Sequence, residues 1–149
     1  MYSLVFCYMK VFPIFIEAGI TGFESPAAEY KELSLSLDQL LISHPNATFI
    51  GQASGESMQG VGIFDGDLLI VDRSLSVKNG DIIVANYNGC FVCKLLDKPA
   101  GVLLSASLVA SKSFAPVSIN PEDTFQLEGV VTRSIRLHHK APELSACLR

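Results

Sequence analysis

The stretch from residue 62 to residue 97 alternates glycine-bearing polar turns with short apolar runs that are rich in β-branched side chains. The pairs Gly66-Asp67 and Gly80-Asp81 each lead into such a run, and Asn88-Gly89 separates two of them. Glycine and asparagine accept the positive φ angles of tight turns, and Asn-Gly is typical of a type I′ hairpin. The pattern therefore predicts consecutive strands at residues 67–72, 82–87 and 91–96.

The flanking sequence extends this pattern and adds one helix. Ser36 is a predicted N-cap with Gln39 in the capping-box position, and His44-Pro45 ends the helix, so we expect it over residues 36–43. His44 is expected to be a capping or surface residue and not a catalytic base. Further strands are expected at residues 47–53, 101–105, 116–119 and 125–132. Short strands at close spacing predict a mainly β, antiparallel fold with one short helix.

Length and charge limit the classes of protein to which the chain can belong. Its 149 residues are enough for one domain with a hydrophobic core, and 49% of them are hydrophobic against 17% charged. The net charge of −4 argues against a surface that binds DNA, because phosphate contacts need clustered Lys and Arg. We therefore expect no direct sequence-specific DNA binding.

The apolar N-terminal segment is expected to be neither a secretory signal nor a membrane anchor. Met1-Tyr2-Ser3 has no basic side chain, and Lys10 and Pro13 interrupt the apolar run short of the roughly 20 residues that a membrane span needs. Residues 11–30 contain several glycines and prolines, which predicts an extended arm. Such an arm is either a protease substrate or a plain disordered terminus.

Cys90 and Cys93 form a C-x-x-C sequence, a spacing that binds zinc in other proteins. Here no second cysteine pair or nearby histidine supplies the other ligands, and positions i and i+3 of a strand point to opposite faces. We interpret both cysteines as small strand residues in a reducing cytoplasm. We predict neither a metal site nor a cofactor.

The segment Ser54–Met58 is a small polar turn between two predicted strands, and it presents Ser57. Such a serine is more often an ordinary loop residue than a nucleophile. Lys94 adds a second feature, because it lies inside a predicted apolar strand. Either its stem packs while the ammonium reaches water, or burial lowers its pKa until the neutral amine accepts the proton of Ser57. Serine–lysine pairs perform nucleophilic catalysis without a histidine.

Four segments in this order resemble the self-cleaving serine peptidase domain, family S24, shared by LexA-type repressors and UmuD. They are Ser54–Met58, Gly66–Asp72, Gly80–Ala85 and Lys94-Leu95. The resemblance spans about residues 12–133. It implies a LexA- and signal-peptidase-like antiparallel β fold with an extended N-terminal arm. It also implies that Ser57 is the nucleophile and Lys94 the general base.

The N-terminal part is similar to UmuD and its plasmid-borne relatives. The similar segments are residues 12–15, 22–23, 25–30 and 37–45. About twenty residues precede the matching cleavage site, which is too few for the helix-turn-helix domain of a repressor. The resemblance therefore implies a mutagenesis subunit of DNA polymerase V.

The resemblance also implies partners and a cleavage site. A RecA–single-stranded-DNA filament would promote self-cleavage, and the shortened homodimer would join a UmuC-like Y-family polymerase for translesion synthesis in the SOS response. The implied parts are an arm, residues 1–21, and a peptidase-like domain, residues 22–149. Thr21-Gly22 matches the scissile bond, although relatives usually carry Cys or Ala before this glycine. Ala18-Gly19 is the alternative.

Three other interpretations are open. The chain can be a non-cleaving binding module of a Y-family polymerase, because a β-branched Thr21 disfavours cleavage. It can be a fragment of a LexA-like repressor, although the N-terminal arm argues against this. A membrane-bound signal peptidase shares the serine–lysine chemistry but needs a membrane anchor, and we see none in the sequence.

Overall fold

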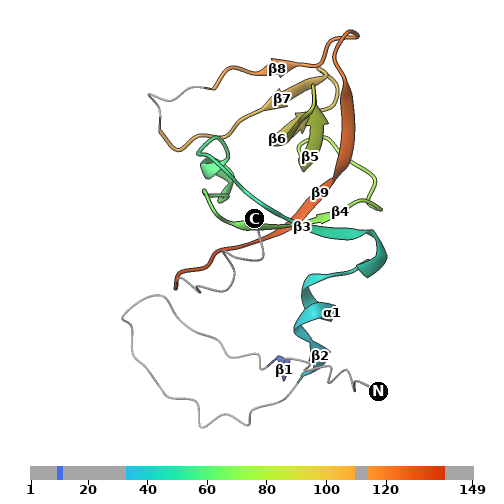
Figure 1. The fold of residues 1–149 in the computed structure, drawn as a ribbon, viewed down its shortest axis with the longest axis vertical. Coiled ribbons are helices and arrows are strands. Elements are labelled where there is room, and N and C mark those ends of the chain that lie inside the picture. Colours follow the sequence, from blue (N-terminus) through green and yellow to red (C-terminus); the bar gives the residue numbers. More distant parts are fainter. Residues whose placement is uncertain (1–9, 12–32, 110–113, 140–149) are drawn as a thin grey trace. The chain divides into compact units, whose positions relative to one another are not determined.

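A computed structural model describes residues 10–11, 33–109 and 114–139 (Figure 1). The chain divides into two compact units, residues 1–43 and residues 44–149, which are considered separately. The predicted boundary between residues 21 and 22 lies outside the described residues and stays a prediction. In the described part of the chain, no helix is long and apolar enough to cross a membrane.

The first unit contains a short strand pair and the predicted helix. Strand β1 (Lys10–Val11) pairs antiparallel with β2 (Leu33–Ser36), and α1 (Leu37–Leu41) follows β2 directly. The capping box is confirmed, because Gln39 N donates to Ser36 Oγ at 3.3 Å and Ser36 N donates to Gln39 Oε1 at 2.9 Å. The helix is shorter than predicted, since Ile42 already has an extended backbone.

The second unit is a seven-stranded antiparallel sheet, which confirms the predicted mainly β fold. The strands run in the order β3-β4-β9-β5-β6-β7-β8 across the sheet. Their bounds are β3 (Thr48–Gln52), β4 (Leu68–Asp72), β5 (Ile82–Tyr87), β6 (Cys90–Asp97), β7 (Val102–Leu104), β8 (Val117–Ser118) and β9 (Phe125–Ile135). Two 3-10 turns, η1 (Pro45–Ala47) and η2 (Gln59–Val61), flank β3. Each predicted strand of this sheet is present, with β9 longer than expected.

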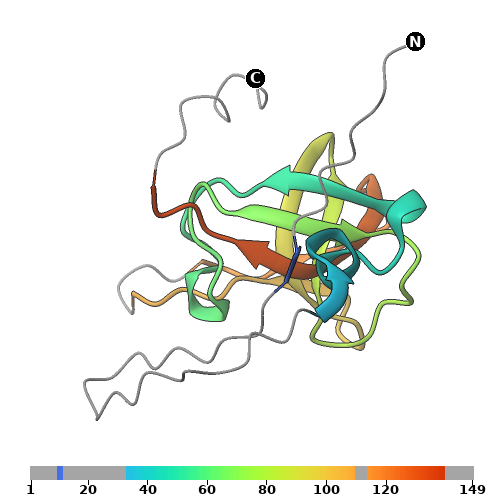
Figure 2. The ribbon, with the colours of Figure 1, turned by 90° about the horizontal axis from the view of Figure 1, so that it is seen from below.

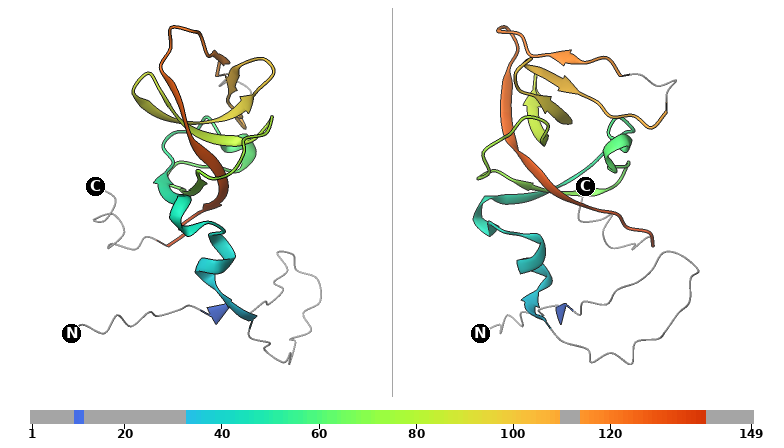
Figure 3. Two further views of the ribbon diagram at one scale, coloured as in Figure 1. Left: turned by 90° about the vertical axis from the view of Figure 1, so that its right-hand side faces the viewer. Right: turned by 180° about the vertical axis from the view of Figure 1, so that it is seen from behind.

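Strand β9 joins the two halves of the sheet. Its residues 130–135 pair with β4, whereas residues 125–130 pair with β5, and the register shifts in both pairings. Figures 1 and 3 show β9 passing from the side of β5–β8 to the side of β3 and β4. In Figure 2, β3, β4 and β9 lie side by side. One strand thus belongs to both halves, and the sheet can bend sharply along it.

The turns of the sheet follow the sequence signals. Asn88 and Gly89 have φ angles of 49° and 83°, as the predicted type I′ hairpin between β5 and β6 requires. His44 is a half-exposed surface residue near the start of β3. Its Nδ1 lies 2.6 Å from Asp72 Oδ2, and this contact connects the start of β3 to the end of β4. Hydrogen bonds from Ser74 and His44 lower the pKa of Asp72 to about 2.

Two groups of apolar side chains fill the unit. The first core consists of Met58, Ile63, Leu69, Val71 and Val84, and the second of Ile83, Ala85 and Leu103. Successive residues of β6 pack against different cores: Cys93 and Leu95 against the first, Val92 and Leu96 against the second. This alternation places Lys94 in the row of side chains that covers the second core.

Candidate active site

The serine turn is held between β3 and β4 by hydrogen bonds and by one buried side chain. Ala53 N donates to Asp67 O at 2.8 Å, and Gly55 N donates to Asp65 Oδ1 at 2.7 Å. Met58 is only 4% exposed and packs in the first core. Because its neighbour Met58 is anchored, Ser57 has a fixed position at the edge of that core.

Lys94 lies in the middle of β6, opposite Ile83 of β5. Val92 and Leu96, two residues to either side, cover the second core, so the lysine stem packs along an apolar row. Lys94 itself is partly buried. The strand therefore places the amine next to the serine turn and keeps it partly shielded from solvent.

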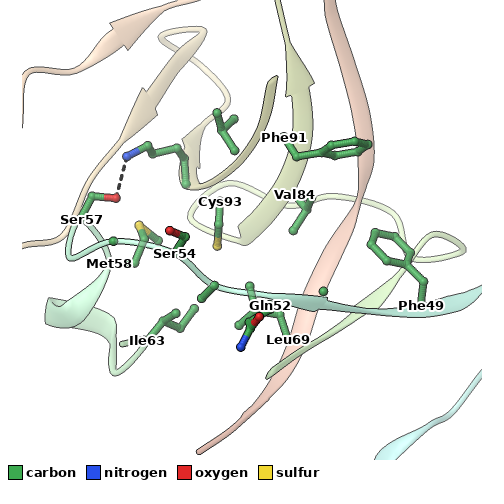
Figure 4. A pocket seen from close by; sticks show the side chains of 15 residues that line it. Phe49, Gln52, Ser54, Ser57, Met58, Ile63, Leu69, Val84, Phe91 and Cys93 are labelled. Carbon is green, nitrogen blue, oxygen red and sulfur yellow. Dashed lines mark hydrogen bonds between the residues drawn. The ribbon is translucent and has the colours of Figure 1, made fainter. Parts of the chain in front are cut away.

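The structure brings the two predicted catalytic side chains into contact. Lys94 Nζ lies 2.8 Å from Ser57 Oγ and 2.8 Å from Ser105 Oγ. The amine also lies over the ring of Phe114, 5.7 Å from its centroid. Figure 4 shows the hydrogen bond between Ser57 and the lysine. The roles of nucleophile and base stay predictions, but the geometry that they need is present.

The surroundings of Lys94 make its neutral form easier to reach than in an exposed lysine. Burial lowers the pKa of Lys94 below its ordinary value, and the neighbouring Cys93 opposes this effect only in part. Burial also raises the pKa of the Cys93 thiol to about 11, so the thiol is neutral near pH 7. A neutral lysine amine has a lone pair that can accept a proton from a serine hydroxyl.

An apolar pocket of about 480 Å³ opens beside the Ser57–Lys94 pair. Ser57 lies at one end and Phe49 at the other, and Met58, Val84 and Cys93 lie between them (Figure 4). The pocket also follows residues 51–55, which include the end of β3. An extended peptide with apolar side chains matches this shape and chemistry.

The sequence analysis also considered a cleavage site and the C-x-x-C pair. Both candidate scissile bonds, Thr21-Gly22 and Ala18-Gly19, fall outside the described residues. Cys90 and Cys93 are free thiols: Cys90 is exposed, whereas Cys93 packs against the first core. No group of three or more His, Cys, Asp or Glu side chains in residues 10–11, 33–109 and 114–139 is arranged to hold a metal ion.

Ser105 is a residue of the site that the sequence analysis missed. It follows β7 directly, and its hydroxyl is as close to Lys94 Nζ as that of Ser57. A signal was present, because the predicted strand at residues 101–105 included Ser105 and a short turn separates it from the strand of Lys94. The pairing register of these two strands was the missing information.

Comparison with known proteins identifies the family of this chain. A model of the family described as Peptidase S24-like matches residues 13–132. The chain belongs to the peptidase S24 family. It is 40% identical to Protein ImpA of Salmonella typhimurium over 139 residues, which cover 89% of this chain and 86% of ImpA. It is 37% identical to Protein MucA of Escherichia coli over 128 residues, or 85% of each chain.

A LexA repressor, from Bordetella avium, is also similar, with 35% identity over 112 residues. This match covers 75% of the present chain but only 51% of the repressor. The predicted resemblance to UmuD-like mutagenesis proteins of family S24 is therefore confirmed. Family membership supports a serine peptidase of the self-cleaving kind.

Proposed function

We propose that this chain is a UmuD-like protein of the SOS response that cleaves itself, with Ser57 as nucleophile and Lys94 as general base. The observation that carries the proposal is the 2.8 Å separation of Ser57 Oγ and Lys94 Nζ at one end of an apolar pocket. Membership of family S24 and the long matches to ImpA and MucA support it.

In the proposed reaction, the neutral amine of Lys94 accepts the hydroxyl proton as Ser57 Oγ attacks the scissile carbonyl carbon. The protonated amine then gives this proton to the departing backbone nitrogen, and the peptide bond breaks to leave an acyl ester on Ser57. Water activated by the same amine hydrolyses the ester. Backbone N–H groups of the serine turn are candidates for stabilising the negative oxygen of each tetrahedral intermediate.

The proposed substrate is the N-terminal segment of the chain. Cleavage between Thr21 and Gly22 would separate the arm, residues 1–21, from the peptidase-like domain, residues 22–149. Cleavage between Ala18 and Gly19 is the alternative. The apolar pocket supports an extended substrate, since it runs away from Ser57 and its walls offer contacts for apolar side chains on one side of the scissile bond.

The proposal extends to the partners of the processed form. A RecA–single-stranded-DNA filament stimulates the cleavage, and the shortened protein then acts as a cytoplasmic homodimer with a UmuC-like Y-family DNA polymerase in translesion synthesis. Direct sequence-specific DNA binding and membrane binding are not part of this role. The matches to ImpA and MucA along most of their lengths favour this role over that of a LexA-like repressor fragment.

The test is incubation of the purified chain with activated RecA filament, followed by intact-mass measurement. We expect the wild type to lose its N-terminal segment and to begin at Gly22, while Ser57→Ala and Lys94→Ala stay full-length. Ser76→Ala is the matched control, because Ser76 is an exposed serine between β4 and β5. A new N-terminus at Gly19 would show that the scissile bond is Ala18-Gly19 and not Thr21-Gly22. A folded wild type that stays uncut would favour the non-cleaving polymerase module.

A further inference from the structure

Ser105 is the cross-strand neighbour of Lys94. Strands β6 and β7 pair antiparallel with Leu95 opposite Leu104, so the next pair in the same register is Lys94 and Ser105. Opposite residues of an antiparallel pair point to the same face with their Cβ atoms close together. The 2.8 Å hydrogen bond from Lys94 Nζ to Ser105 Oγ therefore follows from the strand register.

The same short segment also holds the serine turn. Ala106 N donates to Ser57 O at 2.7 Å, and Gly60 N donates to Ala106 O at 2.6 Å. The approach is close, because a Cβ atom on Gly60 would lie 3.0 Å from the carbonyl carbon and oxygen of Ala106. Ser105 and Ala106 thus contact the lysine through a side chain and the serine turn through the backbone.

Two hydroxyls bond to one amine, and the pocket distinguishes them. Ser57 and Lys94 line the apolar pocket, whereas Ser105 is not among the lining residues in the described part of the chain. A substrate carbonyl in the pocket therefore meets Ser57 first. Ser105 bonds to the same amine but does not line the pocket.

We propose that Ser105 is a positioning residue for the general base: its hydroxyl accepts one amine hydrogen of Lys94, which directs the nitrogen lone pair toward Ser57. This inference rests on the proposed function of the Ser57–Lys94 pair. A neutral amine has two hydrogens and one lone pair, so fixing one hydrogen restricts where the lone pair points. Once the amine is protonated, Ser105 still accepts from it, and the face of Phe114 lies near the new positive charge.

Direct titration of Lys94 tests the contact without any cleavage. Lys94 is followed by NMR of its side-chain Cε–Nζ group, across neutral and alkaline pH, in full-length Ser57→Ala protein so that the chain stays intact. A hydrogen bond to the charged ammonium is stronger than one to the neutral amine, so its loss disfavours the charged form. We expect Ser105→Ala to lower the pKa of Lys94 by up to about one unit and Ser105→Thr to restore it.

Ser107→Ala is the matched control for this titration. Ser107 belongs to the same segment, but its hydroxyl bonds to the backbone of Val109 and not to Lys94. Cys93 is the titratable group whose charge acts on Lys94, and it is present in each variant. An unchanged pKa of Lys94 in Ser105→Ala, equal to that in Ser107→Ala, would overturn the proposal.

Self-cleavage rates across the same pH range give the second readout. We expect Ser105→Ala to cleave about tenfold more slowly at its alkaline plateau, with the midpoint of its pH–rate curve moved to lower pH. A merely structural loss would reduce the rate without moving this midpoint, and would count against a positioning role. If wild type itself is not cleaved while Ser105→Ala still moves the pKa of Lys94, the proposed peptidase function fails and the contact stands.

Discussion

At the scale of single residues, Lys94 sets the pH dependence of the proposed cleavage. Burial lowers its pKa from the ordinary value of 10.5, and only the neutral amine accepts a proton from Ser57. The neutral fraction rises about tenfold per pH unit below the pKa and levels off above it. We therefore expect the self-cleavage rate to rise with pH, with the midpoint of the curve below pH 10.5, as measured by intact mass in a series of alkaline buffers.

Lys94→Arg is the control for this pH dependence, because it keeps the positive charge and removes the base. A guanidinium group stays protonated up to about pH 12. We expect this variant to stay uncut throughout the alkaline series. Self-cleavage of Lys94→Arg, or a wild-type rate that falls as pH rises, would contradict the assignment of Lys94 as the base.

How far the sequence predicts the site depends on the type of information each residue needs. Ser57 and Lys94 stand out from local sequence: one is a serine in a glycine-bearing turn, the other a lysine within an apolar strand. The resemblance to family S24 connects the two without any knowledge of the geometry. The sequence around Ser105 has no such unusual feature, since a serine after a strand is common. Only the register of β6 and β7 pairs it with Lys94.

At the scale of elements, the strands of the sheet were predictable, but apart from the hairpin of β5 and β6 their pairing was not. Turn residues and apolar runs placed β3 to β9 within a few residues of their observed bounds. The sequence analysis did not predict two features, namely the pairing of β1 with β2 and the double pairing of β9. Both join residues far apart in sequence, and hydrophobic periodicity contains no information on such partners.

A substitution at Gly129 tests how closely the bent strand β9 packs against β4. It lies where the register of β9 against β5 shifts, and a Cβ atom there would come within 2.8 Å of Asp72 O and of Val71 Cγ1. Both atoms belong to β4, which cannot move without disturbing the first core. We expect Gly129→Ala to lower the free energy of unfolding by about 1–3 kcal/mol in urea denaturation.

Gly51→Ala is the matched control for Gly129→Ala, since Gly51 is also a strand glycine but a Cβ atom added to it would meet no neighbouring atom within 4 Å. Its free energy of unfolding should change by no more than about 0.5 kcal/mol. Equal losses in the two variants would mean that the bend of β9 tolerates a side chain. The close approach of β4 to Gly129 would then not limit the packing of the sheet.

At the scale of the whole molecule, an ion pair connects the end of the last strand to the turn that follows the serine. Arg136, directly after β9, donates to both carboxylate oxygens of Asp67 at 2.9 Å and to Gly62 O at 2.9 Å. Its guanidinium also lies over the ring of Phe64, 3.9 Å from the centroid. Asp67 is 1% exposed, and its bond to Arg136 is the main reason that its pKa is lowered.

Replacing Arg136 should therefore affect stability and cleavage together. In Arg136→Gln the buried Asp67 carboxylate loses its charged partner, and the turn of residues 62–67 loses its link to β9. We expect a lower urea midpoint and slower self-cleavage, because this turn adjoins Met58 and the serine loop through the first core. Arg73→Gln is the control: Arg73 also stacks on a phenylalanine, Phe49, and pairs with Glu128, but it is largely exposed. An equal effect of both replacements would show that the buried pair with Asp67 has no special role in holding the catalytic unit together.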